Sequence, residues 1–302
     1  MTKFKSLMTA SVLFSISMFA STAEQTKEGP DFSTTEIAPG IYMLMGVGGF
    51  TGGNIGLLIG DDGVVMIDDS MPPLLDKMKV AIRSVTNKPV DFLINTHVHG
   101  DHTGNNQSIG NDGTRIVAHD NLRINMLTKG LKTKDDNKPM PKAALPVITF
   151  SHAMSFHLNG EDLRVFHVEN AHTDGDAVIH YKNANVIHTG DTMFNGMFPY
   201  IDINNGGSVD GYIAAQQKIL SMSNEQTKII PGHGPLANKK QLKQALDMLI
   251  DSKELILELI VKGNTEDEVA QANPLKKYHE KWNWPFITTE KMTRQVYKSL
   301  NQ

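Results

Sequence analysis

The sequence predicts a layered α/β fold whose sheets contain both parallel and antiparallel strands. Three stretches read as β-hairpins, because in each of them two apolar runs flank a short turn sequence. They are residues 56–69 around Asp-Asp-Gly, 155–169 around Asn-Gly, and 177–191 around the turn at 182–185. Helical segments separate the other strands, and this mixture favours mixed sheets over a purely parallel, doubly wound fold.

The remaining elements are predicted from apolar periodicity and from helix-capping and helix-breaking residues. In chain order, they are a strand at 41–45, a helix after Pro72 and Pro73 that ends before Pro89, strands at 90–96 and 114–119, a helix at 120–130, a helix at 211–222, a short strand at 227–233, a long helix at 239–261, and two helices beyond Glu266. We expect one domain over residues 24–302, with a helical C-terminal extension from about 237.

Composition limits the classes of function. The 302 residues carry a formal net charge of -4, with ordinary contents of hydrophobic and charged residues. A nucleic-acid-binding protein usually has a basic face, so no nucleic-acid partner is expected. The chain contains no cysteine, and any zinc site in it must therefore use nitrogen and oxygen ligands.

The first 23 residues read as a secretory signal peptide. Lys3 and Lys5 precede an apolar stretch at 7–20, and Ser21-Thr22-Ala23 fits a cleavage site. A membrane anchor is the alternative, but the apolar stretch is about 14 residues long and a span needs about 20. We therefore expect a periplasmic or secreted protein without a membrane anchor after cleavage.

One short stretch carries an unusual density of metal-binding side chains. The sequence HVHGDH places His97, His99, Asp101 and His102 directly after an apolar run. Imidazole suits zinc, and ligation without sulfur is typical of catalytic rather than structural zinc sites. A polar loop of solvated histidines is the alternative, but four such groups within six positions favour a metal site.

Three further candidate ligands occur in similar positions later in the chain. His172 and Asp191 each follow a predicted strand, and His233 lies between two glycines after another. Functional residues are concentrated in such turns at the ends of strands. One cluster cannot complete two coordination shells, so these residues are predicted to supply the remaining ligands.

The order of these motifs resembles the metallo-β-lactamase superfamily. Asp68 in VVMIDDS, then HVHGDH, His172, Asp191 and His233 match the order of that family's five motifs over roughly residues 41–233. The resemblance implies a four-layer αββα sandwich with mixed sheets, in which the metal ions lie at one edge.

The resemblance also implies residue roles and a cofactor of two Zn²⁺ ions per chain. His97, His99 and His172 would hold the first ion, Asp101, His102 and His233 the second, and Asp191 would bridge them. Asp68 would orient a ligating histidine, although it also fits a turn residue closing the first hairpin. Diiron relatives carry a carboxylate at the position of His99, so the imidazole favours a dizinc hydrolase.

The implied reaction is hydrolysis of a small molecule by a hydroxide shared between the zinc ions, with Asp101 orienting the hydroxide and passing a proton. We expect a β-lactam as the substrate. A lactone or a (thio)ester, as in the glyoxalase-II-like branch, is the alternative, because Asp191 stands where many zinc β-lactamases have cysteine. An iron-dependent thiol dioxygenase and a non-catalytic zinc-binding module are less favoured.

Two aromatic loops are candidate walls of the substrate pocket. Phe50 lies in the glycine-rich segment 45–54, which fits either a lid over the site or a flexible turn. Phe194, Phe198 and Tyr200 follow Asp191 directly, and they fit either a pocket wall or buried loop packing. The C-terminal sequence YHEKWNWPFI, with both tryptophans, is expected to form a hydrophobic cap on the sandwich.

Overall fold

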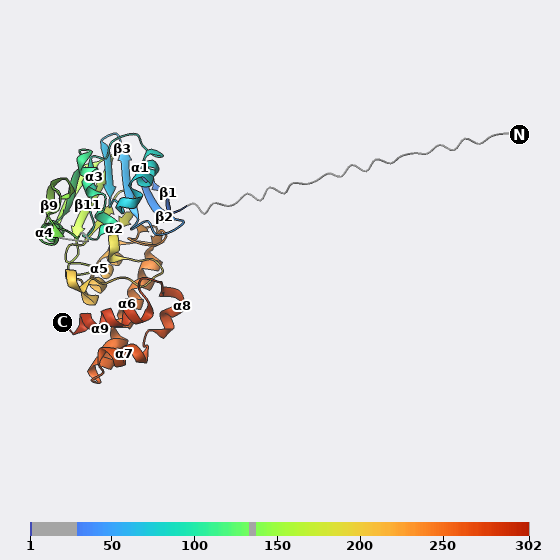
Figure 1. Ribbon diagram of the computed structural model, residues 1–302, viewed down its shortest axis with the longest axis vertical. Helices are drawn as coiled ribbons and strands as arrows, with labels where there is room; N and C mark the ends of the chain where they lie inside the picture. Colours follow the sequence, from blue (N-terminus) through green and yellow to red (C-terminus); the bar gives the residue numbers. More distant parts are fainter. Residues whose placement is uncertain (2–28, 133–136, 302) are drawn as a thin grey trace.

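The computed structural model describes Met1 and residues 29–132 and 137–301, and it contains two stacked β-sheets with helices on both outer faces (Figure 1). The four-layer αββα fold predicted from the sequence is confirmed. Apart from Met1, the predicted signal peptide lies outside the described residues. None of the described helices is long and apolar enough to cross a membrane.

The first sheet has seven strands in the order β1-β2-β3-β4-β5-β6-β9. They are β1 (Asp31–Ala38), β2 (Ile41–Val47), β3 (Ile55–Gly60), β4 (Gly63–Ile67), β5 (Phe92–Ile94), β6 (Arg115–His119) and β9 (Ile148–Phe150). The hairpin strands pair antiparallel, whereas β4, β5, β6 and β9 pair in parallel. The parallel strands follow crossover connections, so the ends of β5 and β6 point to the same edge of the sheet.

The second sheet has six strands in the order β10-β11-β12-β13-β14-β15. They are β10 (Ala153–Leu158), β11 (Glu161–His167), β12 (Ala177–Tyr181), β13 (Val186–His188), β14 (Lys228–Ile230) and β15 (Ala237–Asn238). Both predicted hairpins form, and Asn159 and Gly160 have positive φ angles, as a tight two-residue turn requires. A separate two-stranded ribbon consists of β7 (Leu131–Lys132) and β8 (Asn137–Lys138).

Helices α1 to α4 lie with the first sheet, and α5 to α9 form the other end of the molecule (Figure 1). The helices are α1 (Leu75–Arg83), α2 (Gly100–Thr103), α3 (Asn106–Asn111), α4 (Asp120–Lys129), α5 (Val209–Met222), α6 (Lys239–Val261), α7 (Glu266–Ala272), α8 (His279–Trp282) and α9 (Thr289–Leu300). Short 3-10 helices occur at 72–74, 142–144, 190–192, 203–205 and 276–278. The long helix α6 has the predicted bounds, and a capping box between Asn238 and Gln241 fixes its start.

Three apolar layers hold the sheets and helices together. Strand β4 shows how the sequence builds them, because its side chains alternate between two faces. Val65 and Ile67 belong to the cluster between the two sheets, whereas Met66 packs under α1. A third cluster joins the second sheet to α5, α6 and α9, and includes Tyr212 and Trp282. With both faces covered, the polar residues at the strand ends are left to form a site at the sheet edge.

Candidate metal centre

The histidine-rich loop begins where β5 ends. The strand stops at Ile94, and His97 and His99 lie in the loop that follows. The four-residue helix α2, which the sequence analysis did not predict, then carries Asp101 and His102. As a result, His97 and His99 belong to one group of candidate ligands, and Asp101 and His102 belong to another.

The second sheet supplies the other three candidate ligands. His172 lies in the loop between β11 and β12, and Asp191 lies in the 3-10 helix that follows β13. His233 lies after β14, and an isolated bridge pairs its backbone with Phe194. The structure therefore brings together all seven residues for which the resemblance implied metal ligation.

These side chains form two groups, in each of which the potential ligand atoms lie within 4.8 Å of one another. The first group is His97, His99, His172 and Asp191, and the second is Asp101, His102 and His233. Nε2 of His172 lies 2.9 Å from Nδ1 of His99, and Nε2 of His102 lies 3.3 Å from Nε2 of His233. The grouping matches the two predicted coordination sets.

Asp191 lies between the two groups. Its Oδ2 atom is 3.4 Å from Nε2 of His172 and 3.4 Å from Nε2 of His233, which belong to different groups. Its Oδ1 atom is 3.1 Å from Nε2 of His102. This position is the one that a carboxylate bridging two ions requires.

The pKa values of His97, His172 and Asp191 suit metal binding. Burial lowers the pKa of His97 well below its usual value and lowers the pKa of His172 to about 4, so both imidazoles are neutral. Burial by itself raises the pKa of Asp191, but the nearby histidines, His102 foremost, hold it well below the usual range. Neutral imidazole and ionised carboxylate are the forms that bind metal. Against the effect of burial, the carboxylates around His102, Asp191 foremost, raise the pKa of that ring, so an ion would bind there with release of a proton.

The residues present fit a pair of divalent ions. Nε2 of His97 and Oδ1 of Asp191 are buried, yet neither has a hydrogen-bond partner among the described residues. An unpaired buried polar atom is costly, and a bound cation would satisfy both. The donor set of five imidazoles and two carboxylates, without sulfur, suits catalytic zinc and related divalent ions.

Asp68 fixes the orientation of His102. Its Oδ2 atom lies 2.7 Å from Nδ1 of His102, which leaves Nε2 of that ring to face the site. The carboxylate also accepts hydrogen bonds from the backbone N–H and the hydroxyl of Thr96. Asp68 is completely buried, so the predicted orienting contact is present together with a tie to the histidine loop.

A second orienting carboxylate, Asp202, was missed in the sequence. Its Oδ2 atom lies 2.8 Å from Nε2 of His99, so that Nδ1 of His99 faces the first group. The backbone oxygen of Tyr200 lies 2.8 Å from Nδ1 of His172 in the same way. The only sequence signal was a carboxylate within the aromatic loop after Asp191.

Two glycines let the backbone approach the ligands closely. A Cβ atom on Gly53 would lie 2.0 Å from Cε1 of His102, and one on Gly232 would lie 2.0 Å from Oδ1 of Asp191. Any larger residue at either position would displace a ligand. The glycine-rich loop around Phe50 thus packs against the second group at its base.

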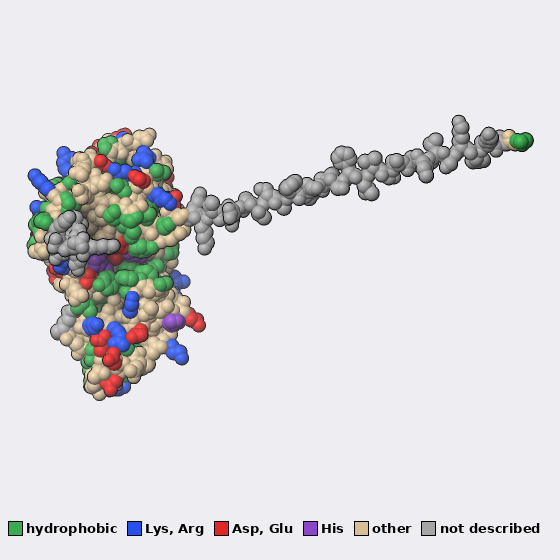
Figure 2. Space-filling view, in the orientation of Figure 1, with side chains coloured by type: hydrophobic (Ala, Val, Ile, Leu, Met, Phe, Trp, Pro, Cys, Tyr) green, Lys and Arg blue, Asp and Glu red, His purple; other side chains and the backbone are tan. Residues whose placement is uncertain are grey.

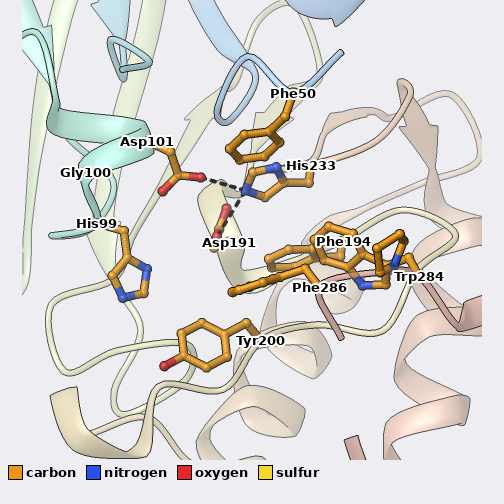
Figure 3. A pocket seen from close by; sticks show the side chains of 11 residues that line it. Phe50, His99, Gly100, Asp101, Asp191, Phe194, Tyr200, His233, Trp284 and Phe286 are labelled. Carbon is orange, nitrogen blue, oxygen red and sulfur yellow. Dashed lines mark ion pairs between the residues drawn. The ribbon is translucent and has the colours of Figure 1, made fainter. Parts of the chain in front are cut away.

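A cavity of about 780 Å³ opens over the two groups (Figure 3). It is lined by Phe50, His99, Gly100, Asp101, Asp191, Phe194, Tyr200, His233, Trp284, Pro285 and Phe286. Three of the four aromatic residues predicted to contact substrate, namely Phe50, Phe194 and Tyr200, lie in this wall. The rings of Phe50 and Phe194 lie on either side of His233, with centroid distances of 6.1 and 4.8 Å.

The prediction for Phe198 is wrong. Its side chain is completely buried and belongs to the core cluster under α5 and α6. Its backbone instead holds the C-terminal segment, because its N–H donates to the oxygen of Trp282 and its oxygen accepts from Nε1 of Trp284. The loop after Asp191 has no regular period, so Phe198 could not be distinguished from Phe194 by its position in the sequence.

Only part of the C-terminal segment forms the expected hydrophobic cap. Trp282 is buried in the core, as expected, but Trp284, Pro285 and Phe286 line the cavity. In Figure 3 the side chains of Trp284 and Phe286 lie beside Phe194, opposite Phe50. Their place in the cavity could not be predicted from the sequence, because an apolar cap and an apolar pocket wall have the same composition.

Comparisons with known proteins agree with this geometry. Among curated proteins, the chain is 22% identical over 231 residues to the 2,4-dinitroanisole O-demethylase subunit alpha of Nocardioides sp., covering 75% of this chain and 66% of that protein. It is 28% identical over 173 residues to a hydroxyacylglutathione hydrolase of Polaromonas sp., covering 56% of this chain and 58% of that protein. The chain thus matches less than two thirds of the length of either relative.

A solved structure has the same fold. The metallo-beta-lactamase from Pontibacter korlensis superposes with a TM-score of 0.61 at 17% identity, covering 73% of this chain and 100% of that one. The sequence profile of the metallo-beta-lactamase superfamily matches residues 48–253, which is more than half of the chain. With its fold and paired His/Asp groups, this chain belongs to the metallo-beta-lactamase superfamily.

Proposed function

We propose that this protein is a zinc-dependent hydrolase that opens an ester- or amide-type bond in a small molecule. The observation that carries the proposal is the position of Asp191, which contacts both ligand groups at the floor of the cavity. A structural zinc site is closed and four-coordinate, whereas seven candidate ligands beside an open cavity suit catalysis.

Two bound divalent ions would polarise the substrate and lower the pKa of a water molecule from ~15.7 to about 7. Asp101 is the group of this chain that can receive the proton. Its Oδ2 atom lies 3.4 Å from Nε2 of His233, and its side chain is partly exposed to the cavity. A carboxylate in that position can orient the attacking water and carry its proton to the leaving group.

The other residues of the site hold this arrangement in place. Asp68 and Asp202 fix the rings of His102 and His99, and such partners usually change metal affinity or activity 10- to 100-fold when removed. The aromatic wall excludes water from one side of the cavity, which strengthens the electrostatic interactions at the reacting centre.

Two kinds of bond fit the site. The likeness of fold to the Pontibacter korlensis enzyme supports a β-lactam, whose cyclic amide is the bond that we expected from the sequence. The hydroxyacylglutathione hydrolase relatives, together with an aspartate at position 191, support a lactone or a (thio)ester. A thioester bearing a glutathione group would place charges against the apolar wall, so a lactone or simple ester is the stronger form of this second candidate.

The first test is turnover by the mature, zinc-loaded protein of a chromogenic cephalosporin and of an aromatic lactone such as dihydrocoumarin. The His99→Ala variant serves as the inactive control. A kcat/KM above ~10⁴ M⁻¹s⁻¹ for one of the two compounds, lost in the variant, identifies the type of bond that the protein hydrolyses. If two zinc ions bind per chain and neither compound nor a panel of simple esters is hydrolysed, the proposal of an acyl hydrolase is wrong.

A further inference from the structure

The cavity has two chemically different sides. The metal-binding groups form its floor, and aromatic side chains form the opposite wall (Figure 3). Among the described residues that line it, none is lysine or arginine. On the face shown in Figure 2, histidine side chains at the middle of the molecule lie beside hydrophobic side chains.

The wall is a continuous row of rings. Phe194 and Trp284 lie 6.1 Å apart between ring centroids, Trp284 and Phe286 lie 5.4 Å apart, and Phe286 and Tyr200 lie 5.6 Å apart. The last two pairs meet edge to face, at 63° and 67°. Such a row offers both ring faces and ring edges, which are the surfaces on which another aromatic group packs favourably.

Hydrogen bonds hold the wall in place. Nε1 of Trp284 donates to the backbone oxygen of Phe198 at 2.8 Å, and the backbone N–H of Trp284 donates to Ile287. Nζ of Lys291 donates to the backbone oxygen of Phe286 at 2.9 Å. Because the segment is already tied to the core and to α9, little ordering is needed when a ligand binds.

The outer part of this wall is formed by residues of the C-terminal extension. The superfamily profile matches residues 48–253, whereas Trp284 and Phe286 lie beyond that range. Phe286 is 52% exposed and Phe50, on the other side of the cavity, is 58% exposed. Large exposed aromatic side chains that face each other across a cavity are typical of a binding site rather than of core packing.

We propose that the site accepts an uncharged substrate with an aromatic group next to the scissile bond, and that Trp284 and Phe286 select that group. This inference rests on the proposed function, because it concerns the same cavity. An anionic group against the row of rings, away from the floor, would lose its hydration, and among the described residues that line the cavity there is no lysine or arginine to pair with it. A cationic group would find ring faces, but two divalent ions on the floor would repel it.

Binding of two matched dyes tests the proposal without any turnover. N-phenyl-1-naphthylamine is neutral, and 8-anilino-1-naphthalenesulfonate is the same skeleton with a sulfonate. With the zinc-loaded protein, we expect the neutral dye to bind at least ~10-fold more tightly, as measured by dye fluorescence. Equal or tighter binding of the sulfonate would overturn the proposal, as would displacement of the neutral dye by phenyltrimethylammonium more readily than by its uncharged isostere tert-butylbenzene.

Variants test whether Trp284 and Phe286 select the uncharged aromatic group. Trp284→Ala and Phe286→Ala should each weaken binding of the neutral dye by roughly 5- to 10-fold, whereas Trp284→Phe should retain most of it. Phe286→Arg should reverse the preference toward the sulfonate. Val80→Arg is the matched control, because Val80 is 59% exposed on α1 and is absent from the cavity lining. Unchanged binding in both alanine variants, with thermal midpoints near that of the wild type, would contradict the assignment.

The two proposals fail in different ways. If the neutral dye binds as expected but no ester, lactone or β-lactam is hydrolysed, the selectivity stands and the proposed reaction is wrong. If hydrolysis is observed while the sulfonate binds as well as the neutral dye, the reaction stands and the inference about Trp284 and Phe286 is wrong.

Discussion

Nε2 of His99 and Oδ2 of Asp202 lie 2.8 Å apart, although 103 positions separate the two residues in the chain. Burial alone would raise the pKa of Asp202, but the hydrogen bonds with His99 and Asn205 and the charges of nearby histidines together outweigh burial and lower the pKa to about 2. The carboxylate is therefore ionised whenever the protein is folded near neutral pH. It keeps the proton of His99 on Nε2, so that Nδ1 faces the first ligand group.

Replacing Asp202 by asparagine should weaken the metal site without removing a ligand. We expect the Asp202→Asn variant to lose roughly 10- to 100-fold in affinity for its more weakly held zinc ion, because the orienting charge is gone. Competition with a chromophoric chelator measures the affinity. Asp210→Asn, which changes an exposed carboxylate on α5, is the control and should bind zinc as the wild type does.

A single methyl group at Gly53 should disturb the second ligand group. The added Cβ of Gly53→Ala would lie 2.0 Å from the ring of His102, so the ring or the loop must move. We expect the stoichiometry of tightly bound zinc to fall from two toward one. Gly29→Ala is the matched control, because a Cβ there meets nothing within 4 Å and Gly29 is absent from the cavity lining. Two tightly bound ions in Gly53→Ala would show that the close packing has no consequence for binding.

Removal of metal should lower stability as well as activity. At a free zinc concentration 100-fold above the dissociation constant, binding of one ion stabilises the folded state by about 2.7 kcal/mol. For a chain of this size, chelation should therefore lower the thermal midpoint by roughly 5–10 °C. The His97→Ala variant should show a smaller shift. A midpoint that does not change on chelation would contradict metal binding by the folded state.

One histidine outside the metal centre should make stability depend on pH. The ring of His167 stacks on that of His119 with centroids 3.8 Å apart, and burial, helped by His119, lowers the pKa of His167 below its usual value of 6.5. The unfolded chain therefore binds the proton more tightly. The contribution of the neutral His167 ring to the free energy of unfolding is complete above pH 6.5 and decreases as the pH falls below this value.

The His167→Gln variant isolates this effect, because glutamine can still donate to the backbone oxygen of Asp176. Relative to the wild type, the variant should gain stability when the pH is lowered from 8 to 5.5, as measured by urea unfolding. Zinc release at low pH affects both proteins and cancels in the difference. A difference independent of pH would contradict the lowered pKa.

Export remains a prediction from the first 23 residues alone. We propose that the chain is cleaved after Ala23 and acts outside the cytoplasm. Mass spectrometry of protein expressed in a Gram-negative host should find Glu24 as the first residue in the periplasmic fraction. An alanine-to-arginine change at Ala23 should block the cleavage. Full-length protein confined to the cytoplasm would refute the prediction.

The residues of the two candidate ligand groups could be predicted from the sequence, whereas parts of the cavity could not. His97, His99, Asp101 and His102 are adjacent, and polar residues of these kinds are rarely grouped after a buried strand without a function. Asp202 gave no such signal, because its meaning depends on a contact across 103 positions.

The roles of the aromatic residues were harder to predict, because burial rather than residue type decides them. Phe194 and Phe198 lie four positions apart in an irregular loop, and one lines the cavity while the other is in the core. Likewise, Trp282 is buried in the core, whereas Trp284 lines the cavity. No periodicity in the chain distinguishes the members of these pairs, since tertiary packing alone sets which side of the loop faces the cavity.

Each ligand group draws on both sheets. His97 and His99 follow β5 and meet His172 and Asp191 of the second sheet, and Asp101 and His102 meet His233 in the same way. Neither half of the chain supplies a complete ligand group, so we expect a metal ion to be bound tightly only after the two sheets have docked. Metal uptake would then be the last step of assembly, and its rate in refolding experiments would report when the halves come together.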